Sequence, residues 1–275
     1  MKPATTITKV CRVLDEFRNH PSIGITDLAK NAGLLPSDVH RILNSLQSYG
    51  YIEQDQATKR YRLGLGLMRL GLTMFQRHDL RDAARPLLQN LSERLEGSSH
   101  MAVYDARAME LFLVEQINFP TAPVFRRRFG ATEDCYCTAL GRVVLANMDA
   151  ASLSEALKHC SIEKKTAKTI TDRDMMEKEL AATRRRGYGL DCEEYLPGVC
   201  CIGAPIHGAK GDVIAAISVS MVKQQFDKWN QDSLASELKA VARQLSALAS
   251  KDSRLAGLGP MPRYVRRIDT SLGNY

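Results

Sequence analysis

The stretch Thr26–Leu63, TDLAKNAGLLPSDVHRILNSLQSYGYIEQDQATKRYRL, decides the fold of the N-terminal part of the chain. Thr26 is a suitable N-cap for a short helix, and Gly33 stands where that helix would end in the left-handed conformation. Pro36 fits the first turn of a second helix, because an N–H group at that position would have no intrahelical partner. Two short strand-like runs around a basic turn complete the stretch. This order predicts a winged helix-turn-helix.

The second helix of this stretch has two distinct faces. From Val39 to Leu46, four apolar residues recur at i, i+3, i+4 and i+7, which indicates one buried face. The opposite face carries side chains that can contact bases or phosphates, so double-stranded DNA is the leading partner. The residues that we expect to contact DNA are Thr26, Ser37, Asp38, His40, Arg41, Asn44, Lys59 and Arg60.

Positive charge is unevenly distributed along the chain. Residues 1–78 hold 11 Lys and Arg against 6 Asp and Glu, and residues 251–275 hold 5 against 2. The central part, 79–250, is nearly balanced, with 22 against 23. A basic excess attracts phosphates. Here its location matters more than its size, because it coincides with the predicted helix-turn-helix.

Cysteine usage and hydropathy limit the cellular compartments and the kinds of binding site that this chain can have. Seven cysteines, an odd number, fit reduced thiols in the cytoplasm. Cys135-x-Cys137 and Cys200-Cys201 do not match the common zinc spacings, and no His pair accompanies them, so we predict no metal and no other cofactor. No apolar run approaches the roughly 20 residues of a membrane span, which predicts a cytoplasmic protein without a membrane partner.

Helical periodicity continues on both sides of the opening stretch. A helix is predicted from near Thr8 to Phe17, where it would complete a three-helix core. Leu65–Gln76 is apolar on most sides, which is typical of a helix covered from several directions. We interpret it as a linker helix buried partly by a second subunit; the alternative is a helix covered entirely by its own chain. The predicted organisation is a winged helix-turn-helix domain over 1–64, a linker helix over 65–78, a second domain over 79–250 and a tail over 251–275.

The second domain alternates helical and strand-like segments. Val213–Val219 is apolar and β-branched, as a central strand would be. Helices interleaved with an antiparallel sheet predict an α+β domain. Across the chain, further helices are predicted at 81–95, 138–148, 172–186 and 231–249, and strands at 51–53, 60–63, 101–105, 111–115, 124–128, 190–193, 201–206 and 213–219.

Eight blocks of sequence match one known family in order. They are LAKNAGL (28–34), VHRIL (39–43), LQSYGY (46–51), RYRLG (60–64), CTALGR (137–142), RGYGLDCEEY (186–195), GVCCIGAPI (198–206) and AISVS (216–220). Any one block is a weak signal, but all of them in this order are highly specific. To about Ala249, the chain resembles the IclR family of bacterial transcriptional regulators.

The resemblance implies a function as well as a fold. It implies an N-terminal winged helix-turn-helix, a linker helix and a C-terminal effector-binding domain related to the GAF and PAS folds. Similar proteins bind an operator as dimers or tetramers and respond to a small organic acid or an aromatic ligand. By this resemblance the chain is a DNA-binding regulator and not an enzyme. Its effector contacts would fall on Ala139, Leu140, Asp191, Cys201, Ser218 and Ser220.

Elementary chemistry agrees with this set of expected effector contacts. Residues 138–140 would begin a helix, where backbone N–H groups can hold a carboxylate. Ser218 and Ser220 are two apart on a strand and therefore share a face. Cys201 would add a small polarizable contact, whereas Asp191 would accept from a hydroxyl or orient its neighbours. The alternatives are that the two serines are satisfied within the sheet and that Asp191 belongs to a turn or a cap.

Two positions depart from the family pattern. Ser37-Asp38 stands where family members commonly have Ser-Thr, and a carboxylate there repels phosphate unless it accepts from a cytosine amino group. Asp134-Cys135-Tyr136 replaces the usual Pro-Leu-His and reshapes the rim of the ligand site. The resemblance therefore carries neither the operator sequence nor the effector class.

A second hypothesis is a thiol-based redox-sensing regulator. A reactive thiol needs positive charge nearby, which Arg142 or the run 126–128 could supply. The simpler interpretation is that these thiols are small buried hydrophobes. No nucleophile with a base and an orienting group is visible, and the runs 126–128 and 184–186 are interpreted as solvated faces. The cysteines near the predicted ligand site are Cys135, Cys137, Cys192, Cys200 and Cys201.

Overall fold

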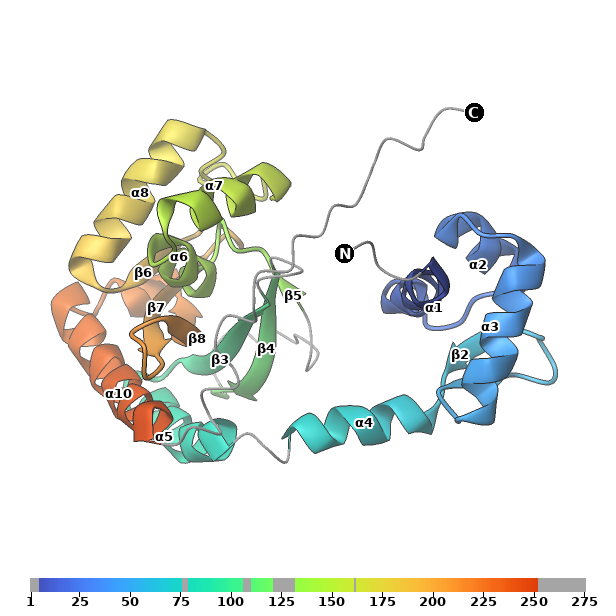
Figure 1. The fold of residues 1–275 in the computed structure, drawn as a ribbon. Helices are drawn as coiled ribbons and strands as arrows, with labels where there is room; N and C mark the ends of the chain where they lie inside the picture. The colour runs from blue at the N-terminus through green and yellow to red at the C-terminus, as the bar shows by residue number, and fades with distance from the viewer. Residues whose placement is uncertain (1–4, 76–78, 106–109, 121–131, 161, 252–275) are drawn as a thin grey trace. The chain divides into compact units, whose positions relative to one another are not determined.

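In the computed structural model, the chain divides into two compact units, residues 1–77 and 78–275 (Figure 1). The structure describes residues 5–75, 79–105, 110–120, 132–160 and 162–251. Within these ranges, no helix is both long and apolar enough to cross a membrane. Each unit has a hydrophobic core of its own, as independent domains do.

The first unit is a helical bundle with a two-stranded wing. The apolar stripe of its third helix is buried as predicted, with Val39 and Leu43 fully inaccessible to solvent. These side chains share one core with Val13 and Leu28 from the two preceding helices. The elements are α1 Thr5–Asp15, the 3₁₀ turn η1 Glu16–Arg18, α2 Ile25–Ala32, α3 Pro36–Ser48, β1 Ile52–Gln54 and β2 Tyr61–Leu63.

The turn between α2 and α3 follows the predicted chemistry. Gly33 ends α2 with φ +63°, and the N–H of Leu34 donates to the carbonyl of Ala29 at 2.9 Å. Glycine adopts this left-handed conformation without steric cost. Pro36 then opens α3 in the position where no N–H is needed.

The predicted start of α2 is wrong. Thr26 is not the N-cap: Gly24 is, and Thr26 is an exposed residue in the first turn of the helix. The reason is tertiary. Ile23 pairs with Tyr61 of the wing through two backbone hydrogen bonds of 2.9 and 2.8 Å, so the extended chain ends there and the helix begins at Ile25.

Helix α4, Leu65–Phe75, is anchored at its start to the winged helix-turn-helix. The N–H groups of Gly64 and Gly66 donate to the carbonyls of Tyr51 and Gly50, each at 2.8 Å. A Cβ added at Gly64 would lie 2.3 Å from the Gly50 carbonyl oxygen, so the backbones can approach this closely only without a side chain. Beyond this anchor the helix exposes apolar side chains. Those that are 46–64% exposed are Leu65, Met68, Leu70 and Leu72.

The second unit is an α+β domain built on a six-stranded antiparallel sheet. The strand order is β5-β4-β3-β8-β7-β6, and β8, Val213–Val222, lies between β3 and β7, as predicted for a central strand. The other strands are β3 Ser98–Asp105, β4 Glu110–Ile117, β5 Thr132–Glu133, β6 Gly189–Cys192 and β7 Val199–His207. The helices are α5 Asp79–Leu95, α6 Ala139–Ala146, α7 Ala150–His159, α8 Arg173–Arg186, α9 Lys223–Phe226 and α10 Gln231–Lys251.

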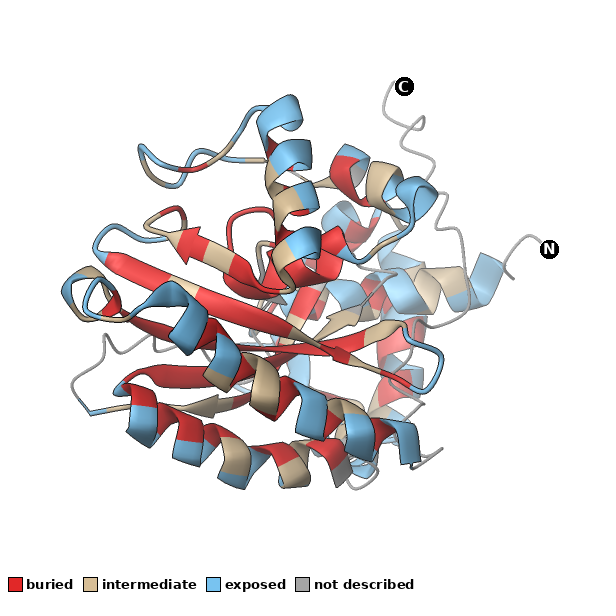
Figure 2. Ribbon diagram, turned by 90° about the vertical axis from the view of Figure 1, so that its left-hand side faces the viewer, coloured by how far each residue is buried: buried red, intermediate tan, exposed pale blue. Residues whose placement is uncertain are grey.

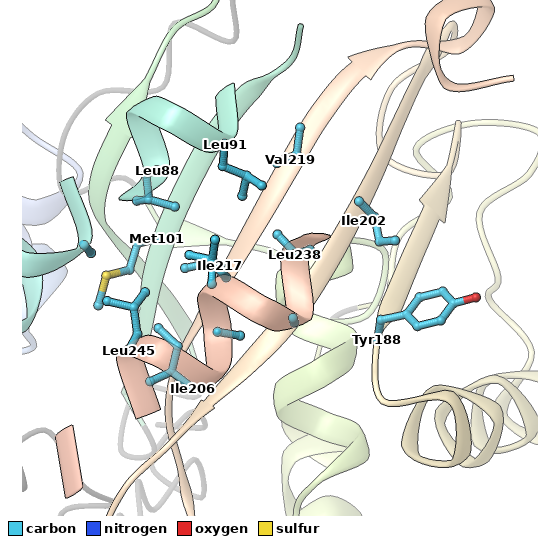
Figure 3. Packing of buried hydrophobic residues seen from close by; sticks show 14 of the residues in the cluster. Leu88, Leu91, Met101, Tyr188, Ile202, Ile206, Ile217, Val219, Leu238 and Leu245 are labelled. Atoms are coloured by element: carbon cyan, nitrogen blue, oxygen red, sulfur yellow. The ribbon is translucent and has the colours of Figure 1, made fainter. Parts of the chain in front are cut away.

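Helices cover both faces of this sheet (Figure 2). On one face, α5 and α10 pack on the strands; Leu91 and Leu238 from these helices meet Ile217 of β8 in the larger core (Figure 3). On the other face, α6 and α8 form a second core with Ala216 of β8. Strand alternation explains the division, because successive side chains of β8 point to opposite faces. It also places Ser218 and Ser220 on the α6 face.

Several elements differ from the predictions. The helix α7 and the short elements β5 and α9 were not predicted, and the strand predicted at 124–128 lies outside the described residues. Of the basic run 184–186, only Arg185 is a plain solvated residue. Arg184 donates to the carbonyl of Ala146 at the end of α6 and to that of Met148 in the turn after it, and Arg186 donates to the carbonyl of Tyr188 at 2.7 Å. These arginines hold α8 to its neighbours, because carbonyls at helix ends and in turns need donors.

Candidate functional site

The exposed face of α3 presents the side chains predicted to meet DNA. Ser37, His40, Arg41 and Asn44 are all exposed, and the side chain of Arg41 is 78% accessible. The amide of Asn44 lies 3.3 Å from Nδ1 of His40, one turn before it. The second helix of a helix-turn-helix lies in the major groove with its N-terminal residues at base edges. The observed face has the accessibility that such a docking needs.

Asp38 is held by basic side chains within the first unit. Its carboxylate lies 2.6 Å from the Lys9 ammonium of α1 and 3.5 Å from the Arg41 guanidinium. The hydrogen bond from Lys9 lowers the pKa of Asp38 below its ordinary value. This pairing offsets the negative charge of Asp38 beside the expected phosphates. The carboxylate therefore needs no contact with a DNA base to be neutralised.

The wing residues differ in their engagement. Lys59 is exposed at the tip with φ +56°, a left-handed conformation. Arg60 is also exposed, but it donates from Nε to the Ser22 hydroxyl at 2.9 Å and from Nη2 to the Ser22 carbonyl at 2.7 Å. Arg60 therefore ties the wing to the loop before α2, whereas Lys59 donates within the wing, from its ammonium to the Gln56 side-chain oxygen at 3.4 Å. Thr26 is exposed in the first turn of α2.

In the second unit, all six residues predicted to contact an effector line one cup. Thr138 was expected beside them at the start of the helix, whereas sequence reasoning missed His100, Tyr195, Leu196 and Val199. For His100, the predicted strand began one residue too late to include it. The empty space between the side chains is about 370 Å³, mouth included. The interior is narrow and has room for little more than ordered water. The lining consists of His100, Thr138, Ala139, Leu140, Asp191, Tyr195, Leu196, Val199, Cys201, Ser218 and Ser220.

The floor of the cup comes from the register of four strands. Asp191 of β6 pairs with Cys201 of β7, which pairs with Ser220 of β8. Two residues before Ser220 on β8, Ser218 pairs with His100 of β3. Residues side by side in adjacent strands share a face, so these polar side chains form a continuous patch under α6. The Cys201 sulfur lies 3.0 Å from the Ser220 hydroxyl.

Helix α6 forms the wall of the cup because two glycines let it approach the sheet. A Cβ at Gly189 or Gly203 would lie 2.6 or 2.7 Å from the Ala139 carbonyl oxygen. Thr138 caps the helix by accepting from the N–H of Gly141 at 3.1 Å. The preceding N–H groups, of Ala139 and Leu140, have no intrahelical acceptor. They begin the helix at the cup, where the positive end of its dipole favours an anion.

Asp191 supplies the carboxylate of the cup's lining. Burial raises its pKa to about 6, although its Oδ1 accepts from the N–H of Glu194 at 2.8 Å and of Tyr195 at 3.3 Å. Close to it, the buried guanidinium of Arg142 donates to both carboxylate oxygens of Glu194, in one case at 2.5 Å. Asp191 and the Arg142–Glu194 pair therefore hold the loop 193–198, which carries Tyr195 and Leu196 of the rim.

Burial governs the thiols of Cys135, Cys137 and Cys160 in this domain. Burial raises the pKa of Cys137 to about 12, and it raises the pKa values of Cys135 and Cys160 as well. These three thiols stay protonated near neutral pH, which makes them poor nucleophiles. The guanidinium of Arg142 is engaged by Glu194 and does not activate a thiol. Among the described residues, no group of three or more His, Cys, Asp or Glu could hold a metal ion.

Comparison with known proteins identifies the family. The profile described as "Bacterial transcriptional regulator IclR C-terminal" matches residues 72–247, and the "IclR helix-turn-helix domain" matches residues 6–56. The chain belongs to the IclR family. The transcriptional regulator XynR of Escherichia coli (strain K12) is 32% identical over 223 residues, which cover 81% of this chain and 88% of that protein.

Solved IclR structures share the fold. The IclR of Thermotoga maritima has a TM-score of 0.62 at 27% identity, covering 89% of this chain and 98% of that one. An IclR homologue from Microbacterium hydrocarbonoxydans, crystallised with 4-hydroxybenzoate, has a TM-score of 0.73 at 23% identity, covering 88% and 98%. The relatives that match are transcriptional regulators rather than enzymes. This chain is accordingly an IclR-family transcriptional regulator with a DNA-binding helix-turn-helix.

Proposed function

We propose that this IclR-family regulator binds a small organic or aromatic acid in the cup and thereby changes its affinity for an operator. The observation that carries the proposal is the convergence of two kinds of donor on one buried space. The N–H groups of Ala139 and Leu140 begin α6 there, and the hydroxyls of Ser218 and Ser220 lie on the floor. Such a donor set suits a carboxylate.

Asp191 is compatible with an anionic ligand because its charge is easily removed. With a pKa of about 6, keeping it protonated at pH 7 costs about 1.4 kcal/mol. The protonated carboxyl can donate to a ligand oxygen while its other oxygen still accepts from the loop. The charged groups that face Asp191 are Arg142 of α6, which favours its ionised form, and Glu194, which opposes it.

We further propose that DNA is read by the exposed face of α3 and by the wing. His40, Arg41 and Asn44 would approach base edges, and Lys59 would contact a phosphate. One recognition helix contacts few base pairs, whereas a dimer presents two helices to half-sites about one helical turn apart, or a multiple of it. The exposed apolar side chains of α4 suit burial against a second copy of this chain.

A ligand screen tests the cup. Thermal unfolding of the full chain is followed with small carboxylic and aromatic acids, beginning with 4-hydroxybenzoate. A ligand at about 100 times its Kd adds about 2.7 kcal/mol of stability. We expect the double variant Ser218→Ala/Ser220→Ala to lose that gain, and the variant Ser233→Ala, at an exposed serine of α10, to keep it. An acid that stabilises wild type and double variant equally would show that it binds elsewhere.

Sedimentation tests the assembly. At micromolar concentration the wild type should sediment as a dimer or a larger oligomer. The double variant Met68→Glu/Leu72→Glu should shift toward monomer, because it places charges on the exposed apolar surface of α4. Arg69→Ala, an exposed position on the same helix, is the matched control and should leave the assembly unchanged. A wild type that remains monomeric both alone and on DNA contradicts the proposal.

A further inference from the structure

Two cysteines that flank the loop 193–198, at its base, lie directly opposite each other on adjacent strands. Cys192 of β6 and Cys200 of β7 are register partners. In the next register position the N–H of Glu193 donates to the carbonyl of Val199 at 2.8 Å, so that position is a hydrogen-bonded pair. Because the two kinds of pair alternate in an antiparallel ladder, Cys192 and Cys200 form a non-hydrogen-bonded pair, with Cα atoms about 4.5 Å apart. Disulfides span Cα separations of about 4.4–6.8 Å.

The surroundings of the two thiols differ from those of the other cysteines in this domain. Strand alternation turns Cys192 and Cys200 away from the cup, toward the core under α10, whereas Cys201 lines the cup. Cys200 is fully buried, and Cys192 is partly exposed. The Cys200 thiol donates a hydrogen bond to the Cys192 sulfur, which lowers the pKa of Cys192, and the nearby Lys223 ammonium acts in the same direction.

We infer that Cys192 and Cys200 are a dithiol switch that a hydroperoxide closes into a disulfide. The Cys192 thiolate attacks a peroxide oxygen, the O–O bond breaks, and a sulfenic acid forms on Cys192 with release of hydroxide or alkoxide. The sulfur of Cys200 then attacks that sulfenic sulfur, loses its proton and displaces hydroxide, which leaves as water. Two thiols lose two electrons and two protons, and the peroxide is reduced to two molecules of water, or to water and an alcohol. A small dithiol reverses the reaction.

The disulfide would close the segment 193–199 at its base. That segment carries Tyr195, Leu196 and Val199 of the cup's lining, and Glu194, the partner of Arg142. A cross-link at the base restricts the opening of this loop. Because the cup is narrow, its lining has to move before it admits a ligand, so the disulfide would hinder ligand binding. The consequence for ligand binding rests on the proposed function; the disulfide and the stiffer loop do not.

Peptide mapping tests the disulfide in the full-length chain. Reduced protein is treated with hydrogen peroxide, alkylated and digested. Trypsin alone leaves all three neighbouring cysteines in one peptide, 187–210, but a protease that cuts after glutamate separates them at Glu193 or Glu194. We expect the two fragments to remain joined in the wild type and in Cys201→Ser, with a mass two hydrogens lower, and to separate after reduction. They should never be joined in Cys192→Ser, and Cys11→Ser, at an exposed cysteine of α1, should match the wild type.

Hydrogen exchange tests the effect on the loop. The amides of Glu194 and Tyr195, which donate to Asp191, should exchange at least about tenfold more slowly in the oxidised protein, and peroxide-treated Cys192→Ser should show no change. The inference would be overturned if the two fragments of the peroxide-treated wild type separated without reduction, or if the link between them were lost in Cys201→Ser. Unchanged exchange in a protein shown to be linked would refute the coupling to the loop. Neither readout uses a ligand, so failure of the proposed function leaves both results interpretable.

Discussion

The raised pKa of Asp191 makes a quantitative prediction about stability and pH. The folded protein holds this proton more tightly than the unfolded chain, because burial raises the pKa from 3.8 to about 6. The resulting stability is complete below pH 3.8 and is lost as the pH rises through 6. At roughly 1.36 kcal/mol per pH unit, the loss is about 3 kcal/mol, of which about 2 falls between about pH 4.5 and 7.5.

The variant Asp191→Asn isolates this contribution. Asparagine stays neutral at every pH, and its oxygen can still accept from the N–H groups of Glu194 and Tyr195. Relative to the wild type, the variant should therefore gain about 2 kcal/mol of unfolding free energy between about pH 4.5 and 7.5. Urea unfolding followed by fluorescence measures the C-terminal domain alone, because the single tryptophan, Trp229, packs on its core. Asp174→Asn, at an exposed position of α8, is the control. A difference between Asp191→Asn and wild type that stays flat across this range would refute the burial argument.

Three further predictions follow from the same structure. Arg41→Ala should weaken binding to the DNA duplex that the wild type selects from a random pool by about 1–3 kcal/mol, measured by fluorescence anisotropy; unchanged affinity in a folded variant removes Arg41 from the interface. Arg142→Ala should destabilise the C-terminal domain by about 3–5 kcal/mol in urea, because it leaves the Glu194 carboxylate buried without its partner; a loss under 1 kcal/mol would mean that water reaches the pair. Met68→Glu/Leu72→Glu should weaken operator binding as well as assembly, since a monomer engages one half-site; full affinity for a two-site duplex from a monomeric variant would contradict this.

The sequence predicted the fold well where local signals agree with tertiary ones. The turn of the helix-turn-helix depends on Gly33 and Pro36, whose backbone preferences are local. The central strand Val213–Val222 is buried on both faces, so its apolar character is strong. The start of α2 was missed because a bridge between Ile23 and Tyr61, 38 residues apart, sets it. Arg184 was misread for the same reason, since its acceptors, the carbonyls of Ala146 and Met148, lie at the end of α6 and in the turn after it.

The candidate site could be predicted only in part. That Ser218 and Ser220 share a face follows from strand periodicity, but the pairing of Asp191 with Cys201 and then Ser220 depends on register across three strands. The resemblance to the IclR family grouped these residues indirectly, because it implies that they all contact the effector. His100 lies on a strand far away in the sequence, and no local signal marks it. Asp38 carries a local signal, but its partner Lys9 lies on another helix, so its neutralisation could not be foreseen.

The cost of the buried polar cluster is itself an argument about function. The same strands that bear Ser218 and Asp191 on the α6 face bury an apolar core on the other, so the sheet needs no polar residue to pack. Ionised Asp191 lowers stability by about 3 kcal/mol at neutral pH, and a buried ion pair such as Arg142–Glu194 is often no more stable than apolar residues of the same volume. Domains are stable by only about 5–15 kcal/mol, so this is a considerable fraction. Local departures from the most stable choice concentrate at functional sites. Of the four Asp, Glu and Arg residues that are buried in the described part of the domain, Arg142, Asp191 and Glu194 lie at the cup, and Glu115 pairs with Arg81 and Arg85 of α5. This clustering favours the α6 face as the place where the domain binds its ligand.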